Sequence, residues 1–116
     1  MEDEKPIVWM GSSLDDLKAL SEKPRRDLGF ALSAVQVGEY PDNAKPMKGL
    51  GGVFEIRTDY DQDTYRAVYA VNLGARIYVL HVFQKKSKKG IETPKPDMDK
   101  IRSRLKRAQE IEKERR

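Results

Sequence analysis

The sequence predicts an α+β fold in which a helical hairpin packs on a twisted antiparallel β-meander. Three observations predict it. Apolar residues recur at helical spacing between residues 13 and 38, three strand-like apolar segments with short links follow between 53 and 84, and a highly charged segment with a helical stripe closes the chain. A length of 116 residues is enough for one modest hydrophobic core.

The N-terminal third predicts a short strand and two helices. The apolar run Pro6–Met10 reads as the strand, and Ser13 with Asp16 three residues later is a helix start. Pro24 can open the second helix, because its missing N–H is unpaired in a first turn anyway, and Gly38 stands where that helix would end. Two helices joined by a few residues usually form an antiparallel hairpin. Residues 39–52 are rich in Gly and Pro and predict a loop.

The middle of the chain predicts three strands, Val53–Thr58, Thr64–Leu73 and Arg76–Gln84. Their links are short, so the strands should form an antiparallel meander. We expect a two-residue turn at residues 74–75 and a four-residue loop at residues 60–63. In that register Arg57 faces Arg66 across the first pair of strands.

This register sorts the side chains of the sheet into two faces, because residues that oppose each other project to the same side. One face would be the core covered by helices, with Phe54, Ile56, Tyr65, Ala67, Tyr69, Val71, Tyr78, Leu80 and Val82. The other face would carry Glu55, Arg57, Arg66, Val68, His81 and Phe83 and continue into Lys85. Two opposed arginines are unfavourable unless an anion lies between them. A solvated outer face explains them, and so does a surface for RNA, where an aromatic ring among cations stacks on bases.

The C-terminal part is strongly basic: residues 85–116 hold 13 Lys and Arg against 6 Asp and Glu. Such asymmetry indicates a polyanionic or acidic partner, or else a solvated basic tail. After a Pro-punctuated connector we expect a basic helix over residues 97–116, an extension of a domain formed by residues 1–96. Its apolar stripe is narrow, so it either lies lightly on the domain or binds a partner; the stripe is Met98, Ile101, Leu105, Ala108 and Ile111.

Several kinds of site are excluded or disfavoured. The chain has no cysteine, which excludes disulfides and thiolate metal sites, and one histidine with scattered carboxylates predicts no metal site. The glycines of KGLGG lack the strand and helix that flank a phosphate-binding loop. An acidic start without a signal-peptide pattern or membrane-length apolar segment predicts a cytoplasmic protein that does not enter membranes.

At this point the sequence resembles a known family. The stretches KPMKGLGGVFEIR (45–57), TYRAVY (64–69) and IYVLHVFQKKSKKG (77–90), with IVWMGSSLDDLKAL and RRDLGFALSAVQVGEYP before them, are similar to the phage-derived branch of the RelE/HigB superfamily of bacterial toxins. The resemblance implies the α+β fold given above. It also implies an endoribonuclease that cleaves mRNA, typically at the ribosome, without metal or other cofactor. A helix-turn-helix antitoxin would be the inhibiting partner.

The resemblance also implies roles for individual residues. Arg66 matches the arginine that contacts the scissile phosphate, and Arg57 falls where relatives have a basic residue on the neighbouring strand. Lys85 and Lys86 match the basic pair after the last strand, and His81 occupies a position that is often histidine. Lys88 and Lys89 extend this basic cluster and are expected to bind the RNA or ribosome backbone, and Phe83 is the expected stacking residue. Glu55 stands where the most active relatives have a basic residue.

Two other functions stay open from the sequence. A non-catalytic phage-derived module could bind an antitoxin-like regulator or RNA. Glu55 and the single histidine favour this reading, and the group of Arg57, Arg66 and Lys85 disfavours it. A general nucleic-acid-binding protein would show strongly salt-dependent binding and no cleavage.

Overall fold

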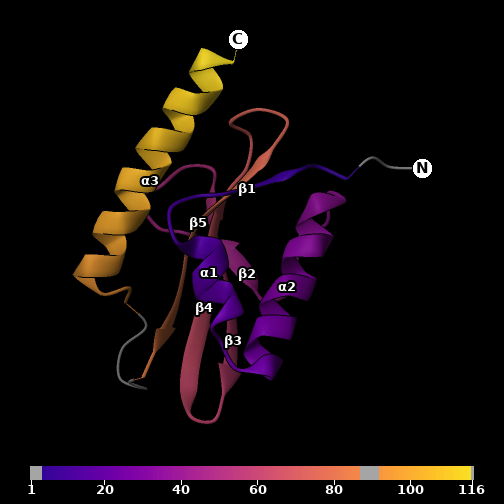
Figure 1. Cartoon of the computed structure of the whole chain (residues 1–116), viewed down its shortest axis with the longest axis vertical. Helices are drawn as coiled ribbons and strands as arrows, with labels where there is room; N and C mark the ends of the chain where they lie inside the picture. Colours follow the sequence, from indigo (N-terminus) through magenta and orange to yellow (C-terminus); the bar gives the residue numbers. More distant parts are fainter. Residues whose placement is uncertain (1–3, 87–91, 116) are drawn as a thin grey trace.

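The computed structural model describes residues 4–86 and 92–115, and every structural statement below concerns those residues. The chain forms one mixed five-stranded sheet with strand order β1-β5-β4-β3-β2 (Figure 1). The elements are β1 (Ile7–Trp9), α1 (Ser13–Lys18), α2 (Glu22–Gln36), β2 (Ala44–Pro46), β3 (Val53–Tyr60), β4 (Asp63–Ala70), β5 (Ile77–Lys85) and α3 (Lys95–Glu114). Strand β1 runs parallel to β5, while the other neighbouring strands are antiparallel. The predicted α+β fold, with its helical hairpin, meander and C-terminal helix, is confirmed.

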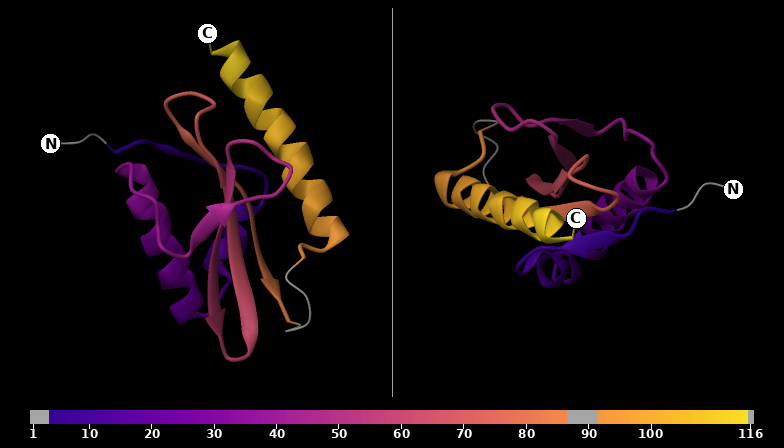
Figure 2. Two further views of the ribbon diagram at one scale, coloured as in Figure 1. Left: turned by 180° about the vertical axis from the view of Figure 1, so that it is seen from behind. Right: turned by 90° about the horizontal axis from the view of Figure 1, so that it is seen from above.

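Helices cover both faces of the sheet. The first face packs against α1 and α2 around Leu17, Leu28 and Leu32. The second packs against α3, whose Ile101 and Ala108 are completely buried. Figures 1 and 2 show α2 and α3 on opposite sides of the strands. The predicted solvated or open second face is therefore wrong, because the C-terminal helix covers much of it. None of the described helices is long and apolar enough to cross a membrane.

The boundaries of the helical hairpin follow local chemistry. Helix α2 begins two residues before Pro24, so the proline occupies its first turn rather than its first position. Gly38 has φ +88°, a left-handed conformation that favours glycine after a helix. Ser12, rather than the predicted Ser13, precedes α1, and its hydroxyl donates to Asp16 at 2.7 Å.

The β3–β4 hairpin has the predicted register, with Asp59 opposite Thr64 and Arg57 opposite Arg66. Its turn is tighter than expected, because Tyr60 and Asp63 also pair. The two remaining turn residues, Asp61 and Gln62, have φ of 51° and 70°. Two successive positive φ angles are typical of the turn whose twist matches antiparallel strands.

The β4–β5 hairpin departs from the predicted register at a β-bulge. Val68 pairs with His81 as predicted, but Tyr69 pairs with Val79, so Leu80 is an extra residue on β5. Because of this extra residue, the side chains of β5 that precede the bulge project to the side of the sheet opposite to the predicted one. Tyr78 and Leu80 therefore lie in the cluster under α3, not in the helical-hairpin core as predicted. The predicted two-residue turn at residues 74–75 is also wrong, since residues 71–76 all lie between the strands.

Strand β2 lies within a segment for which we predicted only loop. Its three residues pair with β3, with Lys45 opposite Glu55. The pairing brings the segment Lys45–Leu50 to the edge of the sheet, where Met47 and Leu50 pack on the same apolar cluster as α3. A three-residue strand containing Pro46 has too little pattern for sequence reasoning to find.

Candidate functional site

The predicted site residues of the meander lie together on the second face of the sheet. Arg57 on β3 opposes Arg66 on β4, and Arg66 opposes Phe83 on β5. His81 pairs with Val68, two residues along β4 from Arg66. Side chains that oppose each other or alternate along a strand share a face, so these four predicted residues form one group. Below, this group together with Glu55 is called the strand-face cluster.

Arg66 is not open to solvent. Its side chain is 2% exposed, and its Nη1 donates to both carboxylate oxygens of Glu55, at 3.4 and 3.2 Å. The Glu55 side chain is 5% exposed. A buried ion pair keeps both charges only because each neutralises the other. The prediction of an exposed arginine patch is wrong at Arg66, and Glu55 already occupies the place of an anion beside it.

Arg57 is more accessible. Its side chain is 37% exposed, and its Nε lies 3.3 Å from the carboxylate of Asp59 on the same strand. Such a partly exposed pair contributes little to stability, so this guanidinium can exchange partners. Of the two opposed arginines, Arg57 is the one that solvent reaches.

His81 is buried between the sheet and α3. Its Nε2 lies 2.6 Å from Asp97, its Nδ1 lies 3.2 Å from Nη1 of Arg104, and its ring stacks on Phe83 with centroids 4.9 Å apart. The arginine can only donate, so Nδ1 accepts and the proton resides on Nε2. Burial is the largest effect on the pKa of His81 and lowers it, and the positive charge of Arg104 lowers it further. The hydrogen bond and negative charge of Asp97 raise this pKa, but it stays lowered overall. This arrangement holds a neutral imidazole.

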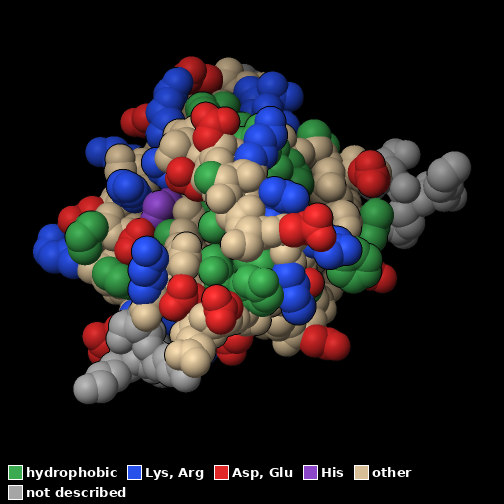
Figure 3. Space-filling model, turned by 60° about the horizontal axis from the view of Figure 1, so that its bottom comes forward, with side chains coloured by type: hydrophobic (Ala, Val, Ile, Leu, Met, Phe, Trp, Pro, Cys, Tyr) green, Lys and Arg blue, Asp and Glu red, His purple; other side chains and the backbone are tan. Residues whose placement is uncertain are grey.

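The predicted RNA-contacting residues differ in how exposed they are. Phe83 is 9% exposed, so its ring face is covered rather than presented for stacking. Lys85 is half-buried and donates to the backbone oxygen of Glu92 at 2.8 Å, whereas Lys86 is exposed. Lys88 and Lys89 lie outside the described residues. Figure 3 shows lysine and arginine side chains interspersed with acidic ones rather than one continuous basic patch.

A cavity of about 430 Å³ lies beside Glu55, and sequence reasoning missed the two lysines that line it. It is lined by Lys45, Pro46, Met47, Lys48, Glu55, Glu92, Thr93 and Met98. Both lysines are exposed. They come from the KPMK segment, which the pairing of β2 with β3 places beside the strand-face cluster. Without β2 these lysines had no predicted position.

Asp97 and Arg104 were also missed. They lie seven residues apart, about two turns, so both project from one side of α3. Arg104 additionally donates to the backbone oxygen of Leu80 at 2.9 Å. The narrow apolar stripe left open whether this helix packs on the domain, and it did not predict that polar residues beside it bind β5. Among the described residues no group of three or more His, Asp or Glu could hold a metal ion.

Comparison with known proteins places the chain in a family. Residues 15–106, most of the chain, match the family model described as Phage derived protein Gp49-like (DUF891). The chain belongs to the family of phage-derived Gp49-like proteins. A search of curated proteins found no significant match.

A solved structure has the same fold. The Gp49-like chain is similar to an alanine double mutant of the Escherichia coli toxin RelE in the free state, with a TM-score of 0.59 and 18% sequence identity. The similarity covers 90% of this chain and 97% of the toxin chain. At this identity the comparison establishes a RelE-like fold, and it carries no residue roles with it.

Proposed function

We propose that this protein is the toxin of a type II toxin–antitoxin system, a metal-independent endoribonuclease that cleaves mRNA, with the ribosome as the site of cleavage. The observation that supports this most directly is the strand-face cluster: two opposed arginines with a neutral histidine and an aromatic ring beside them, on a RelE-like fold. The inhibiting partner would be a helix-turn-helix antitoxin, and the working compartment the cytoplasm, where mRNA and ribosomes are.

The chemistry requires only the RNA and charged side chains. In such a reaction the 2′-oxygen of one nucleotide forms a bond to the adjacent phosphorus, and the bond from that phosphorus to the 5′-oxygen of the next nucleotide breaks. The 2′-OH gives up its proton, the leaving 5′-oxygen gains one, and cationic donors stabilise the charge that develops on the phosphate. Arg66 and Arg57 would bind the phosphate, and neutral His81 would exchange a proton with the attacking or leaving oxygen. Lys85 and Lys86, at the end of β5, would bind neighbouring phosphates, which adds affinity without sequence preference.

RNA binding at this cluster involves an exchange of anions. Glu55 holds the Arg66 guanidinium in the free protein, and a phosphate that binds Arg66 must displace that carboxylate. Phe83 and His81 lie under the first turns of α3, so a base that stacks on Phe83 also requires this end of the helix to shift. The RNA-bound protein should therefore differ from the free protein around residues 92–98.

The alternative is a non-catalytic phage-derived module that binds a regulator or RNA. The buried Glu55–Arg66 pair is the observation that favours it, because a permanently neutralised arginine could not stabilise a transition state.

Induced expression in bacteria, followed by primer-extension mapping of transcript ends, tests the proposal. We expect growth arrest and new 5′ ends within coding sequences, relieved when the gene encoded next to this one is co-expressed. The variant Lys85→Gln/Lys86→Gln should lose most of the toxicity. The matched control Lys5→Gln/Lys18→Gln removes the same charge from exposed positions outside the strand-face cluster and should stay toxic.

Two outcomes would reject the proposal. Harmless expression of the wild-type chain, with tight binding to the neighbouring gene product, would support the non-catalytic module. Equal toxicity of the two double variants would show that the lysines at the end of β5 are not part of the RNA surface.

A further inference from the structure

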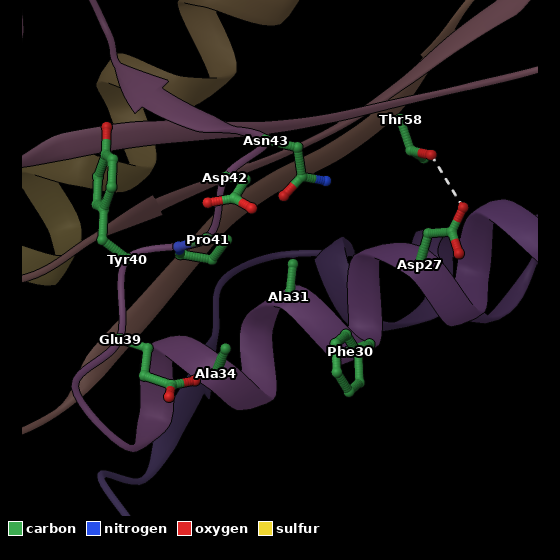
Figure 4. A pocket seen from close by; sticks show the side chains of 10 residues that line it. All are labelled: Asp27, Phe30, Ala31, Ala34, Glu39, Tyr40, Pro41, Asp42, Asn43 and Thr58. Atoms are coloured by element: carbon green, nitrogen blue, oxygen red, sulfur yellow. Dashed lines mark hydrogen bonds between the residues drawn. The ribbon is translucent and has the colours of Figure 1, made fainter.

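The first face of the molecule has a groove of about 640 Å³ that the proposed RNA chemistry does not use. It lies between α2 and the chain segment that leads into β2, with Ala31 and Ala34 on the helix side and Tyr40–Asn43 opposite (Figure 4). Thr58 of β3 also lines it, and its hydroxyl donates to Asp27 at 3.0 Å. The two alanines leave room between the helix and the segment opposite, so a bulky side chain can enter.

The charges that line this groove have one sign. Of the residues that the structure describes, three carboxylates line it and no lysine or arginine does. Asp27 is already bound by Lys23 at 2.9 Å and by Thr58, whereas Glu39 and Asp42 are exposed and make no side-chain hydrogen bond or ion pair with any described residue. In a chain with 23 lysines and arginines, a groove without one is a local departure from the overall basic charge. Two carboxylates are therefore available to a cationic ligand.

Aromatic side chains flank the same groove. Phe30 is 76% exposed on the outer side of α2, and Tyr40 is 56% exposed. Tyr40 is held in place by an edge-to-face contact with Phe54, with ring centroids 5.6 Å apart. Single exposed apolar residues are common on protein surfaces, but two large rings gathered beside one groove are typical of an interaction site.

We propose that this groove binds an arginine-bearing segment of a protein partner. An arginine side chain combines the two properties that the groove complements: its aliphatic stem packs on the alanine floor, and its guanidinium reaches carboxylates and stacks on aromatic faces. Lysine would meet the charge but not the planar stacking. The segment would lie along α2, with the arginine directed toward Glu39 and Asp42 and an apolar neighbour on Phe30.

This inference does not depend on the proposed function. The groove belongs to the face covered by α1 and α2, and the strand-face cluster belongs to the face covered by α3. A partner could therefore occupy the groove while the strand-face cluster is free.

A random dodecapeptide library displayed on phage, selected against the full-length protein, tests this proposal. We expect the selected peptides to be enriched in arginine next to an aliphatic or aromatic residue. Their dissociation constants should rise at least tenfold on Glu39→Lys/Asp42→Lys and several-fold on Phe30→Ser. Both variants change exposed side chains and should keep the thermal unfolding midpoint of the wild type.

The matched control is Glu4→Lys/Asp15→Lys, which makes the same charge change at exposed positions outside the groove and should bind the selected peptides nearly as well as the wild type. If Glu39→Lys/Asp42→Lys and the control weakened peptide binding to the same extent, the overall charge of the protein would explain the effect, and the proposal would be overturned. So would selected peptides that lack arginine enrichment, or a selection that yields no binding peptide. A failure of the growth-arrest experiment would leave these outcomes unaffected, because they depend on different residues.

Discussion

The buried Glu55–Arg66 pair makes a sharp prediction about stability. Replacing Arg66 by methionine keeps the volume and apolar stem but removes the charge that neutralises Glu55. Both side chains are at most 5% exposed, so the carboxylate left behind is buried without this partner. We expect Arg66→Met to destabilise the fold strongly, and Glu55→Leu/Arg66→Met to recover most of the loss, because it removes both charges together.

The magnitude follows from the burial of the pair. Breaking a buried ion pair costs about 3–5 kcal/mol. Glu55 also lines the cavity of about 430 Å³ beside Lys45 and Lys48, so water and a second cation can reach it after the substitution. We therefore expect Arg66→Met to lower the free energy of unfolding by about 3 kcal/mol, the lower end of that range. The free energy of unfolding of a domain of this kind is about 5–15 kcal/mol in total. Replacing such pairs by apolar residues is often neutral, so the double variant should lie within about 1 kcal/mol of the wild type.

Urea unfolding followed by the fluorescence of Trp9, the single tryptophan, measures these differences. The slope of the unfolding free energy with urea concentration should be the same for all variants, so that their transition midpoints can be compared directly. An Arg66→Met variant within about 1 kcal/mol of the wild type would refute the reasoning. A double variant as unstable as the single one would refute it as well, since the loss would then come from packing around Arg66 and not from the carboxylate. The same experiment shows why loss of toxicity in an Arg66 variant alone could not prove a catalytic role.

Three further predictions test the contacts of β5 and the end of α2. Burial lowers the pKa of His81 from its ordinary 6.5, so below that pH the unfolded chain binds a proton that the folded chain does not. The free energy of unfolding should therefore fall as the pH drops below about 6.5 and stay level above it. Urea titrations at pH 5–8 measure this dependence, and His81→Gln should abolish it. The hydroxyl of buried Tyr78 donates to Glu112 near the C-terminal end of α3. Tyr78→Phe should therefore lower the free energy of unfolding by about 1 kcal/mol and speed amide hydrogen exchange in the last turns of that helix. Unchanged exchange would show that Tyr78 does not anchor the helix. Gly38→Ala should cost about 1 kcal/mol through backbone strain alone, because φ is +88° and no atom of the described part of the chain lies within 4 Å of the added methyl group. Thermal unfolding that matches the wild type would contradict this.

The sequence predicted the elements well where periodicity is strong, and it failed where one residue changes the register. Strands β3 to β5 and the opposition of Arg57 and Arg66 followed from alternation and short links. The bulge at Leu80 did not, because both faces of the sheet are apolar near the start of β5. Tyr78 and Leu80 are acceptable on either face, so the segregation of side chains could not reveal the shift.

The candidate site was predicted in its composition but not in its environment. Strand spacing places Arg66, His81 and Phe83 on a common face, and the structure has them there. Their burial depends on long-range contacts, since Asp97 and Arg104 come from a helix that lies after the basic connector. A narrow apolar stripe on that helix left its packing undecided. The sequence placed Glu55 on the face of the two arginines, where it could neutralise one of them, but it did not indicate that Glu55 and Arg66 are buried together.

The way α3 is held on β5 explains how so narrow a stripe can cover a sheet. Polar side chains along the helix each bind β5 or its flank: Asp97 binds His81, Arg104 donates to Leu80, and Glu112 binds Arg76 and Tyr78. Directional contacts at both ends and the middle fix the helix, with Ile101 and Ala108 providing the apolar contact between them. A ligand that binds His81 therefore has to replace its contacts with Asp97 and Arg104, at the first end and in the middle of the helix, while those of Glu112 can persist. The geometry favours a movement of α3 about its C-terminal half over complete release.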